Sequence, residues 1–101
     1  MKVVFHIDEK DKFKLTWANV NNILTENPSV KVSVVINSEA VELFTNKEIV
    51  LKENVTYYIC NNALNMRNVN KKDLIKGLNI TNSGVYQVLL LQNEGYYYIK
   101  P

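Results

Sequence analysis

The chain has 101 residues, of which 47% are hydrophobic and 22% are charged, and its formal net charge is +2. This composition is ordinary for a globular protein, and the length predicts one domain, residues 1–101, rather than two. The eleven lysines and one arginine are scattered along the chain and form no basic stripe with interleaved aromatic residues. We therefore expect no nucleic-acid partner.

The single cysteine and the short apolar runs restrict the compartment and the chemistry. Cys60 has no second cysteine to pair with, which favours a reducing, cytoplasmic compartment. No apolar stretch approaches the ~20 residues that cross a bilayer, and the first apolar run is too short for a signal peptide, so we expect no membrane partner. One histidine and one cysteine cannot close a zinc site, and no glycine-rich phosphate loop follows the first predicted strand. We expect neither a metal nor a cofactor.

The first third of the chain predicts a strand, a helix and a second strand. Residues 3–7 form an apolar run interrupted only by His6, which is typical of a buried strand. Apolar residues at helical spacing then predict an amphipathic helix over about 13–26, with Asp11 as a candidate N-cap. The valine-rich run 30–36 predicts the next buried strand.

The middle of the chain predicts short helices around a third strand. Ser38 can cap a helix over 39–44, and the capping-box spacing at 45–48 favours a second helical turn. Residues 55–59 are β-branched and aromatic, which predicts a strand buried on both faces. A short helix follows Cys60 and ends near residue 67.

The last third predicts a single helical turn, a strand, a helix and a final strand. The turn covers 71–76, the fourth strand 78–81, the last helix 84–94 and the fifth strand 96–99. The expected buried stripe of the last helix consists of Val85, Val88 and Leu89. The tyrosines of the final strand have apolar area that a subunit interface would cover.

Strands and helices alternate five times along the chain. This pattern predicts an α/β fold, a three-layer α/β/α sandwich with a five-stranded parallel or mostly parallel sheet. Ligands bind at the carboxyl ends of the strands in such sheets. His6, Asn37 and Cys60 with Asn61 and Asn62 would gather at that edge if the first three strands are neighbours.

Two interpretations of Cys60 remain open from the residues alone. A thiol at the end of a strand and the start of a helix has its thiolate stabilised by the helix dipole and free N–H groups, as in a nucleophile. A lone cysteine is also common as a small buried hydrophobe. His6 has the same two interpretations, since it either assists the thiol or is hydrogen-bonded within the core.

Several segments resemble the DsrE/DsrF-like family of small sulfur-relay proteins, in particular its short stand-alone branch. The resemblance is carried by KVVFHID, VVINSEAVELF, YYICNNAL and the tail NKKDLIKGLNITNSGVYQVLLLQNEGYYYIKP, which together cover nearly the whole chain. The segments CNNAL and G-V…LQ-x-E-G-Y are its most specific parts. Between residues 44 and 55 the chain departs from the family pattern, where relatives have a longer helix.

The resemblance implies a parallel-sheet α/β/α sandwich and a homo-oligomer, since members of the family assemble into dimers, trimers or hexamers. For this chain we expect a trimer or hexamer, with a weaker case for a dimer. It also implies that Cys60 carries sulfur as a persulfide between a sulfur donor protein and a sulfur acceptor protein. Asn61, Asn62 and Asn37 would then bind near the anionic sulfur, with His6 in its environment. The alternative is a non-catalytic oligomeric binding module that holds a small anionic ligand, with Cys60 in the wall of its pocket.

Overall fold

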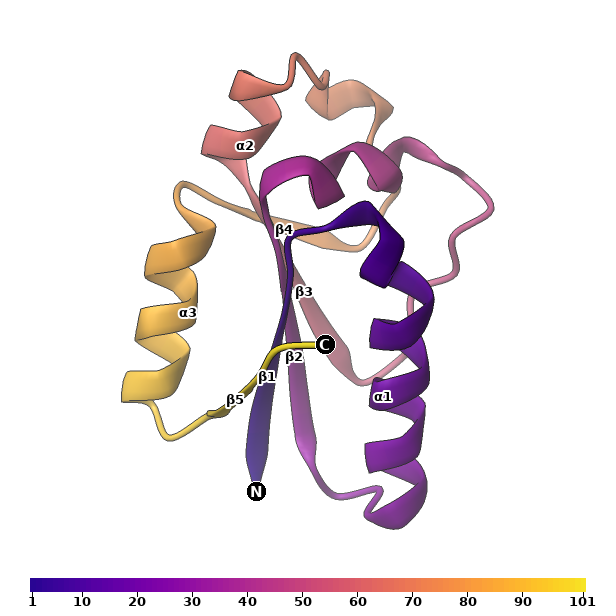
Figure 1. Cartoon of the computed structure of the whole chain (residues 1–101), viewed down its shortest axis with the longest axis vertical. Helices are drawn as coiled ribbons and strands as arrows, with labels where there is room; N and C mark the ends of the chain where they lie inside the picture. The colour runs from indigo at the N-terminus through magenta and orange to yellow at the C-terminus, as the bar shows by residue number, and fades with distance from the viewer.

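The structure is a computed structural model that describes all 101 residues. One sheet of five parallel strands runs through the molecule in the order β4-β3-β2-β1-β5 (Figure 1). The strands are β1 (Lys2–Ile7), β2 (Lys31–Ile36), β3 (Val55–Cys60), β4 (Leu78–Thr81) and β5 (Tyr97–Ile99). The α-helices are α1 (Phe13–Glu26), α2 (Asn61–Met66) and α3 (Gly84–Asn93), and the 3-10 helices are η1 (Lys10–Lys12), η2 (Ser38–Thr45) and η3 (Lys71–Asp73).

The helices form a layer on each face of the sheet. Figure 1 shows α1 on one face, α3 on the other, and α2 beyond the carboxyl end of β3. The predicted α/β/α architecture with five parallel strands is confirmed, and β1, β2 and β3 are neighbours as the site prediction required. None of the helices combines the length and the hydrophobicity that spanning a bilayer needs.

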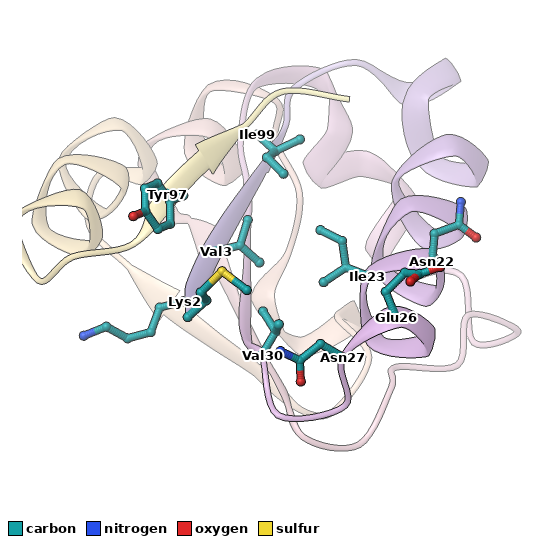
Figure 2. A pocket seen from close by; sticks show the side chains of 10 residues that line it. Lys2, Val3, Asn22, Ile23, Glu26, Asn27, Val30, Tyr97 and Ile99 are labelled. Atoms are coloured by element: carbon teal, nitrogen blue, oxygen red, sulfur yellow. The ribbon is translucent and has the colours of Figure 1, made fainter.

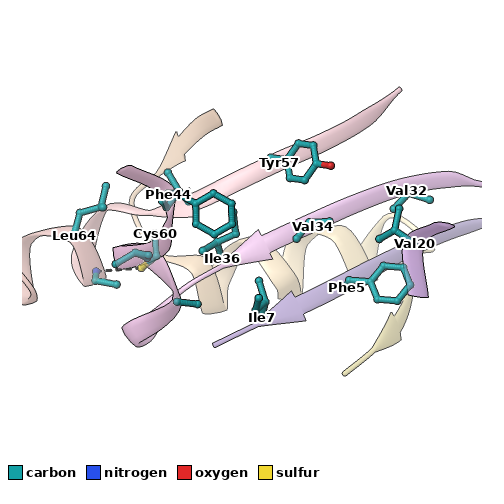
Figure 3. Close-up of a cluster of buried hydrophobic side chains, with 14 of the residues drawn as sticks. Phe5, Ile7, Val20, Val32, Val34, Ile36, Phe44, Tyr57, Cys60 and Leu64 are labelled. Atoms are coloured by element: carbon teal, nitrogen blue, oxygen red, sulfur yellow. Dashed lines mark hydrogen bonds between the residues drawn. The ribbon is translucent and has the colours of Figure 1, made fainter. Parts of the chain in front are cut away.

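Side-chain alternation along the strands produces a separate core on each face. The larger core packs between the sheet and α1, η2 and α2 (Figure 3), and its strand residues include Val3, Phe5, Ile7, Val34 and Ile36. The smaller core packs under α3 and consists of Val4, Val35, Val88, Leu91 and Tyr96. The central strands β1 and β2 are buried on both faces, which explains why their sequences are mostly apolar.

The buried stripe of α3 differs from the prediction. Val88 is buried as expected, but Val85 and Leu89 are 67% and 59% exposed. The stripe that contacts the sheet is Gly84, Val88 and Leu91, spaced at i, i+4 and i+7. The helix is apolar on nearly every side, so periodicity alone could not select the buried face.

The segment after β2 also differs from the prediction. Ser38 does not cap a helix: it is the first residue of η2 and has a positive φ of 51°. Asn37 takes the cap position without a side-chain cap hydrogen bond, which leaves its amide free for another contact. The segment 39–44 is 3-10 rather than α-helical. At the expected second turn, 45–48, no helix forms, but the N–H of Ile49 donates to the carbonyl of Asn46 and closes a single turn.

Two other predicted helix starts are shifted. Asp11 lies inside η1, and Lys12 precedes α1 with no side-chain cap hydrogen bond. The predicted turn 71–76 is shortened to η3, whose cap is the side chain of Asn70, accepting from the N–H of Lys72. Both segments lie outside the sheet layers, where few tertiary contacts fix the residue at which a short helix begins.

Candidate functional site

Cys60 is the last residue of β3 and the residue before α2. Its Sγ accepts a hydrogen bond from the backbone N–H of Ala63 at 3.4 Å (Figure 3), so the thiol itself caps the helix. The thiol is free, and the residue is only 6% exposed. A carboxyl-end position and a backbone donor at the sulfur are features that stabilise a sulfur anion.

Gly84 brings the start of α3 against the ends of β2 and β3. A Cβ atom placed on Gly84 would lie 3.0 Å from the Cβ of Asn37 and 3.1 Å from the Cβ of Cys60. Only glycine allows this approach without displacing its neighbours. Asn37 and Cys60 therefore flank the same point of the helix, on the α3 face of the sheet.

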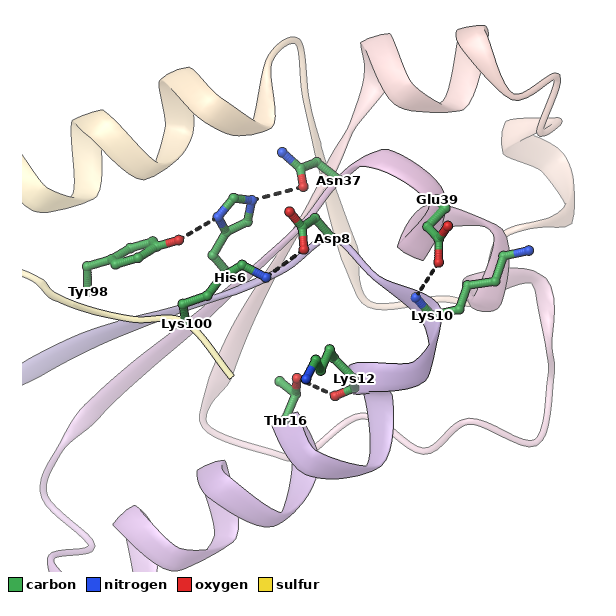
Figure 4. Close-up of polar contacts among 9 residues, drawn as sticks. All are labelled: His6, Asp8, Lys10, Lys12, Thr16, Asn37, Glu39, Tyr98 and Lys100. Atoms are coloured by element: carbon green, nitrogen blue, oxygen red, sulfur yellow. Dashed lines mark hydrogen bonds and ion pairs between the residues drawn. The ribbon is translucent and has the colours of Figure 1, made fainter.

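His6 links the ends of three strands through its two ring nitrogens. Nε2 lies 2.9 Å from Oδ1 of Asn37, after β2, and Nδ1 lies 2.8 Å from the hydroxyl of Tyr98, on β5 (Figure 4). A carboxamide oxygen only accepts, so Nε2 carries a hydrogen and donates to Asn37. In the neutral imidazole, Nδ1 then accepts from the Tyr98 hydroxyl. His6 thus occupies a polar cluster at the predicted edge rather than an apolar core.

Tyr98 is the member of this cluster that sequence reasoning missed. The three tyrosines at 96–98 suggested an interface, and nothing local distinguishes the middle strand position. The signal that could have found it is the alternation of side chains between the two faces of a strand. Tyr98 pairs with Val4 in the parallel register, so both side chains lie on the α3 face of the sheet. Burial raises the pKa of Tyr98, with an opposing effect from the Lys100 ammonium, so the phenol remains a hydroxyl donor.

An ion pair closes the β5 end of the cluster. Nζ of Lys100 donates to Oδ1 of Asp8 at 2.6 Å (Figure 4). This hydrogen bond is the main cause that lowers the pKa of Asp8 and raises the pKa of Lys100. The carboxylate and the ammonium are therefore both charged at neutral pH and neutralise each other beside His6.

Asn61 and Asn62 occupy different environments. Asn61 is partly buried, and its Oδ1 is a buried side-chain oxygen with no hydrogen-bond partner. Such an oxygen costs about 1–3 kcal/mol, and a bound donor would offset that cost. Asn62 is exposed, and its backbone N–H donates to the carbonyl of Asn82 at 3.2 Å. Their roles at the sulfur stay predictions.

The cavities of the molecule lie away from Cys60. A cavity of about 390 Å³ opens at the amino ends of β1 and β5 beside α1, with an apolar lining that includes Val3, Ile23 and Ile99 (Figure 2). Another, of about 640 Å³, lies between the segments 47–51 and 72–76. A third, of about 260 Å³, borders Phe13 and Leu43. No group of three His, Cys, Asp or Glu side chains is placed to hold a metal ion.

Comparison with known proteins gives a family and a structural relative. The family model described as DsrE/DsrF-like matches residues 2–101. The fold is similar to that of MTH1491 from Methanobacterium thermoautotrophicum, described as a protein of unknown function, with a TM-score of 0.86 and 29% sequence identity. That match covers 99% of this chain and 98% of the other. Comparison with curated proteins gives no match.

Proposed function

Because the chain belongs to the DsrE/DsrF-like family, we propose that it is a small sulfur carrier that holds sulfur as a persulfide on Cys60. The observation that carries this proposal is the position of the only cysteine. It ends a parallel strand, its sulfur accepts a backbone N–H, and the Cβ atoms of Cys60 and Asn37 both lie against Gly84. A sulfur donor protein and a sulfur acceptor protein would be its partners. The exchange needs reduced thiols, so we place it in the cytoplasm.

The transfer is a thiol exchange. The Cys60 thiolate attacks the terminal sulfur of a donor persulfide and forms a new S–S bond. The S–S bond of the donor breaks, and the donor leaves as a thiolate that takes up a proton. The same exchange with an acceptor thiolate returns Cys60 to its starting form, and no external oxidant or reductant is consumed.

The burial of Cys60 determines which donors can react. Because only 6% of Cys60 is exposed, we expect a slender donor group to reach the sulfur more readily than a bulky reagent. The same burial slows the reaction of a carried sulfur with dilute thiols in solution, so that only a large excess of thiol removes it, because exchange rates depend on access to the sulfur attacked. A carrier benefits from this selectivity.

Intact mass after incubation with a persulfidated donor tests the proposal. We expect a gain of about 32 Da, one sulfur atom, that excess thiol removes. Cys60→Ser, which is nearly isosteric, should fold and take up no sulfur. Ser33→Ala, elsewhere in the sheet, is the matched control and should load as wild type. A wild-type chain with a free thiol that takes up no sulfur from competent donors would exclude the carrier function.

We also propose that the protein is a homo-oligomer, a trimer or hexamer rather than a dimer. The support is the outer face of α3, where Val85, Tyr86 and Leu89 are 67%, 59% and 59% exposed. A helix that is apolar on all sides is normally covered on all sides. The exposed Tyr97 of the edge strand β5 adds further apolar area at an unpaired sheet edge.

A second candidate function is the binding of a small anionic ligand. The observation that favours it is the cavity of about 640 Å³, which is lined by Lys47, Lys72 and Lys76 together with Ile49, Leu51, Leu74 and Ile75. Three ammonium groups with an aliphatic floor suit an anion with an apolar body. Sequence analysis placed Cys60 in the wall of the anion-binding pocket. Cys60 does not line this cavity.

Fluorescence titration with an anilinonaphthalene sulfonate dye tests this second function. Lys72→Glu should abolish dye binding at the cavity, because it reverses one of the three charges. Lys31→Glu changes an exposed lysine outside the cavity and should leave binding intact. Equal binding to both variants would exclude the lysine cavity as the site.

A further inference from the structure

The segment 46–52, which connects η2 to β3, is held by hydrogen bonds on two sides. The indole N–H of Trp17, on α1, donates to the carbonyl of Val50 at 3.3 Å. Nζ of Lys47 donates to the carbonyl of Asp73, the last residue of η3, at 2.9 Å. These contacts fix the segment between α1 and η3, so the side chains that it carries can form lasting walls of the cavities beside it.

The lysine cavity, the cavity of about 640 Å³ that Lys47, Lys72 and Lys76 line, carries positive charge that no ion pair neutralises. Lys72 and Lys76 form no ion pair, and the ammonium of Lys47 has only carbonyl partners. The acidic residues of the two segments that form it, Glu48 and Asp73, do not line it. The rest of its lining is aliphatic. An anion with an aliphatic tail therefore suits both the charge and the lining.

Two aliphatic side chains bound the lysine cavity in different ways. Leu51 lies against Gly77, where a Cβ atom would come within 2.9 Å of Cδ1 of Leu51, so main chain stands directly behind that side chain. Ile49 is the one residue that lines both the lysine cavity and the cavity of about 260 Å³ beside Phe13 and Leu43. The two cavities therefore meet at Ile49.

We propose that Ile49 determines the specificity of the lysine cavity, because its side chain limits the aliphatic tail of a bound anion to a short length. This inference rests on the anion-binding function proposed above and names the ligand class of that site. A short tail lies against Leu51, Leu74 and Ile75. A longer tail meets Ile49, which keeps it out of the neighbouring cavity at Phe13.

Such a limit has a measurable effect on affinity. Each methylene group that leaves water strengthens binding about fourfold. A tail that ends before Ile49 gains this factor with every added carbon, whereas carbons beyond the limit stay in water and add nothing. Ile49→Ala removes the side chain beyond Cβ and joins the two cavities, so the gain should continue into the second one.

Isothermal titration calorimetry with straight-chain alkanesulfonates, kept below the concentrations that form micelles, tests the inference. These anions share one ionised head group and differ only in tail length. In wild type, affinity should rise from butanesulfonate over the shorter tails and stop rising before decanesulfonate. In Ile49→Ala it should rise throughout, so that decanesulfonate binds about tenfold more tightly than it binds wild type. Leu51→Ala is the matched control: Leu51 lines the lysine cavity alone, so affinity should level off as in wild type.

Backbone amide NMR locates the bound tail. Decanesulfonate should shift the amides of Phe13 and Leu43 in Ile49→Ala and leave them unchanged in wild type and in Leu51→Ala. A tail in the second cavity is thereby separated from a general loosening of the segment 46–52. Phosphatidylglycerol vesicles, whose tails stay inside the bilayer, should not sediment the protein. Sedimentation that Lys72→Glu abolishes would overturn the assignment to a free anion.

Three further results would overturn the inference, and they separate it from the function on which it rests. Affinity of wild type that keeps rising through decanesulfonate would do so even if no variant folds. Binding that Lys72→Glu abolishes, with the same length dependence in wild type and Ile49→Ala, would overturn the role of Ile49 and leave the anion-binding function standing. No binding of any sulfonate would overturn both.

Discussion

Gly84 is the residue on which the approach of α3 to the sheet depends. Its hydrogen atom occupies the space where a Cβ would meet the Cβ atoms of Asn37 and Cys60, and neither of these can rotate away. Gly84→Ala should therefore lower the free energy of unfolding by about 1–3 kcal/mol, less any gain in helix propensity.

Urea unfolding compares this variant with Lys14→Ala, a substitution on α1 away from the outer face of α3. Lys14 is exposed, so its truncation should change stability by less than about 0.5 kcal/mol. A Gly84→Ala protein as stable as wild type would mean that the contact of α3 with the sheet is looser than described.

Individual residues of the site were predicted unequally well. Cys60 ends β3, Asn37 follows β2 and His6 is the next-to-last residue of β1, and that placement could be read from apolar runs. Tyr98 could not be assigned in the same way, because its partner His6 lies 92 positions away and only the register of β5 on β1 brings them together.

At the scale of the elements, an ion pair between Lys100 and Asp8 holds the carboxyl end of β5 beside the end of β1. Hydrogen bonding to the ammonium lowers the pKa of Asp8 in the folded chain. The contribution of the pair is therefore present above the ordinary pKa of an aspartate and is lost as pH falls through the lowered pKa. Both side chains are about one-third exposed, so the contribution should be below about 1 kcal/mol.

Asp8→Asn should reduce stability at neutral pH, and the difference from wild type should vanish in strong acid. Chemical denaturation at a series of pH values measures it. Asp11→Asn, an exposed carboxylate without an ion pair, is the control and should show a smaller pH-dependent difference. If Asp8→Asn is still less stable than wild type in strong acid, the loss of stability does not come from the charge of Asp8.

Element types were predicted best where the pattern is strong. All five strands and the helices α1 and α3 follow from apolar runs and helical spacing. The segment between β2 and β3 was predicted poorly, because η2 is set by a positive φ at Ser38 and by packing of Phe44, not by local capping signals. The prediction of which α3 residues are buried was wrong because so many residues of this helix are apolar that their spacing does not single out one face.

At the scale of the whole molecule, the uncovered face of α3 predicts assembly. Light scattering at micromolar concentration should give a mass that is a multiple of 11.7 kDa. Leu89→Lys places a charge in the centre of that face and should yield a folded monomer.

Val50→Lys is the matched control, since Val50 is 79% exposed and its carbonyl accepts from the indole N–H of Trp17, on the α1 side of the sheet. It should assemble as wild type does. A wild-type mass of 11.7 kDa, with circular dichroism showing a native fold, would contradict the assembly.

The attachment of β5 has a consequence for folding and motion. The three exposed residues of β5 pair only with β1, which lies more than ninety positions earlier in the chain. Bringing the two strands together therefore costs much chain entropy and is repaid by few hydrogen bonds. Segments of this kind open locally before the rest of a domain. In the Leu89→Lys variant, where subunits add no protection, native-state hydrogen exchange should be faster for the amides of β5 than for those of β2. Equal protection of the two strands would contradict this. Each opening breaks the hydrogen bond between Tyr98 and His6, so opening of the sheet edge would loosen the polar cluster that also holds Asn37 at the end of β2.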